Sequence, residues 1–76
     1  MRTAARSLDK FGRNLARLRS KRGLTQERLA EEADINTRYL QKLEGGVGHP
    51  SLVVMCSLKR ALRCRWDELL EKVEMP

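Results

Sequence analysis

The stretch from Leu24 to Gly46 constrains the fold of this chain more than any other part of the sequence. It holds two short amphipathic segments, 25–33 and 37–44, separated by a turn of three residues, 34–36. Apolar residues recur in both segments at the spacing of a helix face. Two helices joined so tightly cannot lie antiparallel, so they must cross steeply. In that geometry one helix can enter the major groove of DNA while the other lies against the backbone.

The rest of the sequence predicts a scaffold for this pair, and the expected fold is all-α with five helices and no strand. Polar side chains suited to N-caps, Thr25, Asn36 and Ser51, precede the second, third and fourth helices. Gly23 is expected to end the first helix in the left-handed conformation, and Asp34 the second. The expected helices, with their opening caps, cover about 8–22, 25–33, 36–44, 51–62 and 66–73.

The expected core comes from apolar residues at helical spacing along all five helices. Residues 1–7 are polar and are expected to form a flexible basic arm before a single domain, 8–76. The expected inward side chains are Leu8, Phe11, Leu15 and Leu18 in the first helix, Leu29, Ala30 and Ala33 in the second, Leu40 and Leu43 in the third, and Leu52, Met55, Cys56, Leu58 and Leu62 in the fourth; the apolar residues of the fifth are Leu69, Leu70 and Val73.

The charge is unevenly distributed along the chain. Residues 1–28 hold nine basic and two acidic side chains, whereas residues 29–76 hold seven basic and eight acidic ones. The whole net charge of +6 therefore lies in the N-terminal third. A solvated surface is the simplest explanation, but the adjoining helix pair favours contact with a polyanion such as DNA. A membrane surface fits less well, because no segment joins a broad apolar face to a basic one.

The sequence offers little for catalysis or metal binding. Cys56 and Cys64 are not at metal-ligand or redox spacing, and His49 is the only histidine. No paired carboxylates, phosphate-binding glycine loop or nucleophile with its base is present, so no cofactor, no metal and no enzymatic activity are expected. No apolar run approaches the ~20 residues of a membrane span. The start of the chain lacks the apolar region of a signal peptide, so we expect a cytoplasmic, nucleoid-associated protein.

Short motifs in order from Phe11 to Leu70 resemble the lambda-repressor-like DNA-binding domain, the Xre/Cro type of helix-turn-helix. Each motif alone is weak, but their shared order and spacing are specific. The size of the chain is similar to that of small phage repressors and of restriction–modification controllers. The matching residues are Arg19, Gly23-Leu24-Thr25-Gln26, Leu29-Ala30, Glu44-Gly45-Gly46, Pro50-Ser51 and Asp67-Glu68-Leu69.

The resemblance implies roles for individual residues of the helix pair and the first helix. It places Gln41 at a position that more often contacts the DNA backbone, yet its amide can pair with adenine, so we include it among the base readers. The expected base-reading residues are Thr37, Arg38, Gln41 and Lys42. The expected backbone contacts are Gln26 and Tyr39, which the resemblance implies, together with Thr25 and with Arg13 and Arg17 on the basic face of the first helix. The resemblance also implies a structural ion pair between Arg19 and Glu44.

The fourth helix departs from the family pattern. Val53 and Val54 stand where polar residues are usual, Lys59 replaces a small residue, and Arg63 replaces the glycine that usually ends this helix. A left-handed arginine would cost roughly 1 kcal/mol, so the helix is expected to end differently here. If this apolar pair is exposed, it suggests a partner surface; packing of the pair against the loop is the alternative. The residues expected at a homodimer interface are Val53, Val54, Trp66, Leu70 and Val73.

The favoured function is sequence-specific binding of double-stranded DNA by a small transcriptional regulator, with the recognition helix Thr37–Glu44 in the major groove. Regulators of this kind usually bind as two-fold dimers. The alternative is an antitoxin-like protein-interaction module that binds a protein partner first and DNA only secondarily. Exposure of Val53, Val54 or Trp66 would favour that alternative.

Overall fold

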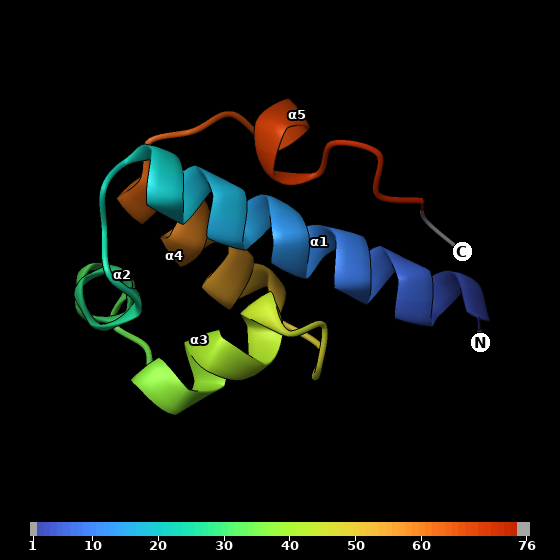
Figure 1. Cartoon of the computed structure of the whole chain (residues 1–76), viewed down its shortest axis with the longest axis horizontal. Coiled ribbons are helices and arrows are strands. Elements are labelled where there is room, and N and C mark those ends of the chain that lie inside the picture. Colours follow the sequence, from blue (N-terminus) through green and yellow to red (C-terminus); the bar gives the residue numbers. More distant parts are fainter. Residues whose placement is uncertain (1, 75–76) are drawn as a thin grey trace.

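The computed structural model describes the backbone of residues 2–74 and the side chains of residues 5–74. This part of the chain contains five helices and no strand, which confirms the predicted all-α fold (Figure 1). The helices are α1 (Arg2–Lys21), α2 (Gln26–Ala33), α3 (Thr37–Glu44), α4 (Leu52–Leu62) and α5 (Trp66–Leu69).

The central helices begin and end where the predicted caps lie. The side chains of Thr25, Asn36 and Ser51 accept hydrogen bonds from the backbone N–H groups of the helices they open, at 2.8–3.1 Å. Gly23 (φ 71°) and Asp34 (φ 57°) adopt the left-handed conformation that ends a helix. Of these residues, Asp34 and Asn36 fix the two ends of the turn between α2 and α3.

A single core joins the five helices. In Figure 1, α1 lies between α3 on one side and α5 on the other, and α2 packs against α3 and α4. Burying these apolar side chains is the main stabilising contribution to the domain. The fully buried large apolar side chains are Leu15, Leu29, Leu40, Leu43, Leu58, Leu62 and Leu69.

Gly12 sets how closely α3 approaches α1. A Cβ atom on this residue would lie 2.4 Å from the carbonyl oxygen of Leu43 and 2.7 Å from that of Glu44. Only glycine allows the two backbones to come so close without a shift. The last turn of α3 is therefore seated directly on α1.

Several predicted boundaries are wrong at the two ends of the chain. The first helix begins at Arg2, not at Leu8, although fraying of residues 2–7 in solution stays a prediction. The last helix ends at Leu69, not at Val73. Asn14 explains this early end, because its buried amide donates to the carbonyl oxygens of Leu69 (3.0 Å) and Glu71 (2.9 Å). The chain after α5 is thereby held against α1.

Two predictions for α4 are also wrong. Leu52, expected in the core, is 72% exposed, because it follows the Ser51 cap on the outer side of the first turn. Arg63 does adopt the left-handed conformation (φ 52°) and ends the helix. Its N–H donates to Arg60 and that of Cys64 donates to Lys59, at 3.1 and 3.3 Å, which completes a Schellman motif. These bonds offset the strain of holding an arginine, in place of glycine, in the left-handed conformation.

Candidate nucleic-acid interface

The outer face of α3 is a row of polar side chains on a firmly anchored helix. Leu40 and Leu43 are buried beneath the helix, with at most 2% of their surface exposed. The opposite face presents Arg38, Gln41 and Lys42 to solvent. Thr37 lies half-buried at the N-terminal end of the row, and Tyr39 is half-buried against the core. The helix therefore offers hydrogen-bond donors and acceptors on its exposed face.

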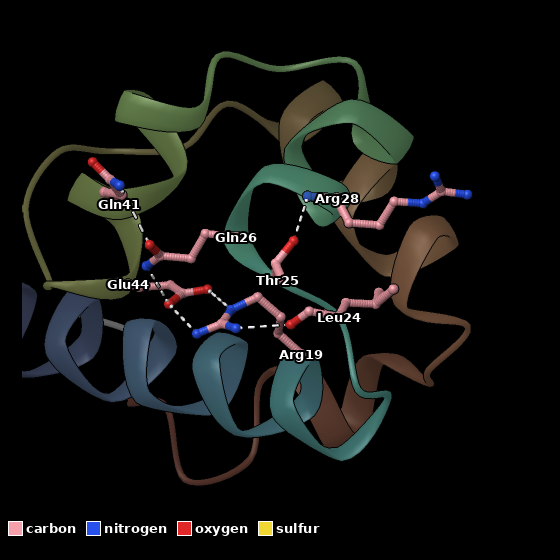
Figure 2. Close-up of polar contacts among 7 residues, drawn as sticks. All are labelled: Arg19, Leu24, Thr25, Gln26, Arg28, Gln41 and Glu44. Atoms are coloured by element: carbon pink, nitrogen blue, oxygen red, sulfur yellow. Dashed lines mark hydrogen bonds and ion pairs between the residues drawn. The ribbon is translucent and has the colours of Figure 1, made fainter.

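A hydrogen-bonded network behind this row ties α3 to α1 and α2 (Figure 2). Glu44, at the end of α3, accepts two bonds from the guanidinium of Arg19, from Nε at 2.7 Å and from Nη2 at 3.1 Å. Arg19 Nη1 also donates to the carbonyl oxygen of Leu24, at 2.8 Å. The resemblance implied this pair of charged residues, and the structure places them in direct contact.

The same carboxylate holds the first residue of α2. Gln26 Nε2 donates to Glu44 Oε1 at 3.0 Å, and Gln26 Oε1 accepts from Gln41 Nε2 at 3.3 Å (Figure 2). The network therefore runs from Arg19 to the exposed face of α3. Sequence analysis missed the contact between the two glutamines, which depends on the crossing angle of α2 and α3.

Burial strengthens the central ion pair. The side chains of Arg19 and Glu44 are 18% and 7% exposed. The hydrogen bond that Arg19 donates to Glu44 raises the pKa of Arg19, so the guanidinium stays charged. A charge-assisted, bidentate pair in this setting is geometrically specific, because the flat guanidinium matches the flat carboxylate. The pair holds the end of α3 in a fixed orientation.

The two basic residues expected on the DNA side of α1 are engaged with acidic neighbours. Arg13 pairs with Asp9 at 3.0 Å, and both side chains are largely exposed. Arg17 pairs with Glu71 at 3.1 Å and also donates to Asn14. Glu71 follows α5, and α5 and α3 lie on opposite sides of α1 in Figure 1.

Comparison with known proteins identifies the family. A sequence profile described as "Helix-turn-helix domain" matches residues 10–72. The chain belongs to this helix-turn-helix family. It is 37% identical over 59 residues to y4dJ of Sinorhizobium fredii, described as an uncharacterized HTH-type transcriptional regulator, covering 78% of this chain and 77% of that protein. It is also similar to the HTH-type transcriptional activator BcrR of Enterococcus faecalis, with 32% identity over 65 residues, covering 86% of this chain and 32% of BcrR.

A solved structure supports the same assignment. The fold is similar to the crystal structure of the restriction-modification controller protein C.AhdI from Aeromonas hydrophila, with a TM-score of 0.79 and 39% identity. The match covers 82% of this chain and 94% of C.AhdI. The predicted class, a DNA-binding helix-turn-helix regulator, is confirmed, and these findings do not support the antitoxin-like alternative.

The residues expected at a dimer interface fall into two groups in this helix-turn-helix domain. Val53 (74% exposed) and Trp66 (37%) are open to solvent, although Lys59 Nζ lies 5.5 Å from the centre of the Trp66 ring. This exposure is the feature expected to favour the protein-interaction alternative, but the comparisons do not support that alternative. Val54, Leu70 and Val73 are half-buried and pack against the core. Sequence analysis missed Leu52, which lies beside Val53 and extends the exposed apolar surface at the start of α4.

Two further findings concern other kinds of site. Among the described residues, no cluster of histidine, cysteine and acidic side chains is placed to hold a metal ion. Cys56 and Cys64 are both free and half-buried. None of the described helices combines the length and the apolar character needed to cross a membrane.

Proposed function

We propose that this protein regulates transcription by placing α3 in the major groove of a specific duplex sequence. The observation that carries the proposal is the exposed polar row of Arg38, Gln41 and Lys42 on a helix whose opposite face is buried. It is supported by the similarity to y4dJ and BcrR, which are described as transcriptional regulators, and to the controller C.AhdI. In this proposal the protein acts by binding alone, without catalysis, and works on the nucleoid in the cytoplasm.

The proposed base readers differ in the chemistry they offer. Arg38 and Lys42 present donors suited to guanine O6 and N7, and Gln41 presents an amide suited to adenine. Thr37 offers a methyl group to a thymine methyl from its half-buried place at the start of the helix.

The proposed backbone contacts lie around this row. Gln26 and Thr25 open α2, where unpaired backbone N–H groups favour a phosphate, and Tyr39 lies on α3. Arg13 can contact a phosphate once its ion pair with Asp9 opens. We leave Arg17 out of the interface, because it is paired with Glu71 beyond α1.

A two-fold operator requires a second copy of the chain, because one copy supplies one recognition helix. We propose that the second copy docks through the start of α4, where Leu52 and Val53 are exposed. Leu70 and Val73 are poorer sites for testing a dimer than the sequence suggested, because a charge there would also disturb the core.

Selection of bound fragments from random duplex DNA, followed by sequencing, tests the proposal directly. We expect a defined two-fold motif. Arg38→Ala should then relax the preference at one base pair of each half-site by about 1–3 kcal/mol, whereas Arg13→Ala should weaken binding to all duplexes alike. Recovery of no motif, or an equal loss of specific and random binding in Arg38→Ala, would refute base reading by α3.

The dimer is tested separately by sedimentation with and without the selected duplex. Val53→Glu should give a folded monomer with weakened operator binding, because a charge near a two-fold axis repels its own symmetry mate. A matched change at the exposed Val47, Val47→Glu, should leave association unchanged. A wild-type chain that stays monomeric on its selected duplex would overturn the dimer.

A further inference from the structure

In the network behind α3, the chemistry of Glu44 fixes which groups donate hydrogen bonds and which accept them. Glu44 is a carboxylate, which accepts hydrogen bonds and donates none. Arg19 donates to both of its oxygens. Any amide that meets Glu44 must therefore present its NH2 group.

Gln26 is the amide that meets Glu44. Its Nε2 donates to Glu44 Oε1, so its Oε1 is turned the other way, toward Gln41. An amide oxygen accepts and does not donate, so Gln41 must in turn offer Nε2 to it. The charge on Glu44 thus sets the orientation of two successive amides, the second of which lies on the exposed face of α3 (Figure 2).

This orientation decides what Gln41 has left for a ligand. One N–H of its amide is used by Gln26. Its Oε1 and its second N–H stay available, which gives one acceptor beside one donor. Adenine presents the matching pair in the major groove, the N6–H donor and the N7 acceptor. Guanine presents two acceptors, O6 and N7, which suit an amide turned to offer both of its N–H groups.

We propose that Gln26 and Glu44 are positioning residues for base recognition, which orient the amide of Gln41 so that it reads adenine and rejects guanine. This inference rests on the proposed function, because it requires α3 to lie in the major groove. It adds a specificity role for two residues that do not read a base themselves. Without the network, the side-chain amide of Gln41 can flip and bind either adenine or guanine.

The experiment measures discrimination at one base pair. Comparison of the motifs selected by the wild type and by Gln41→Met identifies the base pair that Gln41 reads. The wild type should favour adenine over guanine there by about 5- to 150-fold. Gln26→Met keeps a flexible side chain of similar length but removes both hydrogen bonds. It should reduce the discrimination to about threefold or less, while preferences at other positions persist.

Two controls separate this role from a structural one or from a phosphate contact by Gln26. Removing a phosphate contact lowers affinity for all four base pairs alike and leaves their ratio unchanged. In a Gln41→Met background, Gln26→Met should cause no further change in base preference. Gln26→Ala, checked by circular dichroism, serves as a second variant should Gln26→Met unfold.

Each outcome bears on the inference. If the Gln26 variants weaken binding yet keep the full adenine-to-guanine ratio, the inference is overturned. It is also overturned if Gln41→Met changes the preference at no base pair. If the wild type selects no sequence at all, the proposed function fails instead, which is a distinct result.

Discussion

Removal of Glu44 gives the sharpest test of how the helix pair is held in place. In Glu44→Ala, Arg19 loses two hydrogen bonds, of 2.7 and 3.1 Å, and Gln26 loses one of 3.0 Å. Breaking a buried ion pair by removing one partner typically costs 3–5 kcal/mol. Arg19 keeps its bond to the carbonyl oxygen of Leu24 and is 18% exposed, so water solvates part of the orphaned charge. We therefore expect the lower end of that range, about 3 kcal/mol.

That loss is large for a domain of this size. At roughly 0.05–0.15 kcal/mol per residue, the whole free energy of unfolding is about 4–11 kcal/mol. A loss of about 3 kcal/mol should lower the melting temperature by about 12–24 °C. Thermal and urea unfolding, followed by circular dichroism at one salt concentration, would measure the effect.

Glu71→Ala is the matched control for this prediction. Glu71 also pairs with an arginine, Arg17, but both side chains are about half exposed. An exposed pair contributes only about 0–1 kcal/mol. The hydrogen bond from Asn14 reaches the backbone of Glu71, so the substitution leaves it in place. If Glu44→Ala melts within a few degrees of Glu71→Ala, the ion pair between Arg19 and Glu44 does not hold α3 in place, and the reasoning is wrong.

Three further predictions concern the salt dependence of binding, the helix crossing and a thiol. Affinity for the selected duplex should fall about 10²–10⁴-fold between about 50 and 200 mM salt; salt-independent binding would contradict a phosphate-based interface. Gly12→Ala should lower the melting temperature although alanine favours helices, because its Cβ would meet two backbone oxygens of α3 at 2.4 and 2.7 Å; an unchanged melting temperature would refute that close approach. Burial raises the pKa of the Cys64 thiol, so the stability gained from its neutral form is present below about pH 8.5 and is lost as pH rises through the folded-state pKa. Urea titrations from neutral to alkaline pH should show that loss in the wild type, and Cys64→Ala should lack that component.

The parts of the fold that depend on nearby residues could be predicted from the sequence. Thr25, Asn36 and Ser51 each cap a helix through a backbone N–H two or three residues ahead, so α2, α3 and α4 begin where expected. The end of α5 could not be predicted this way. It depends on Asn14, which lies 55 residues away from Leu69 along the chain.

In the candidate site, too, features set by nearby residues could be predicted and contacts between distant residues could not. The polar row of α3 follows from helical periodicity, because Leu40 and Leu43 must point inward and leave the other face outside. The contact between Gln26 and Gln41 joins residues 15 positions apart, and it forms only once α2 and α3 cross at the observed angle. A glutamine that opens α2, a second one near the middle of α3 and a glutamate at the end of α3 are the sequence signal that would suggest such a network.

The distribution of free charge gives a different picture from the distribution of charge along the sequence. The N-terminal third holds the whole net positive charge, which suggested α1 as the phosphate-binding surface. In the folded chain, however, Arg13 and Arg17 are paired with Asp9 and Glu71. On α3, by contrast, Arg38 and Lys42 are exposed and take part in none of the ion pairs found among the described residues. A phosphate that replaces a carboxylate already paired with an arginine gains little, whereas one that meets an unpaired cation gains the full attraction. Arg38 and Lys42 should therefore contribute more to the electrostatic attraction of DNA than Arg13 and Arg17 do, even though α1 carries more basic residues than α3.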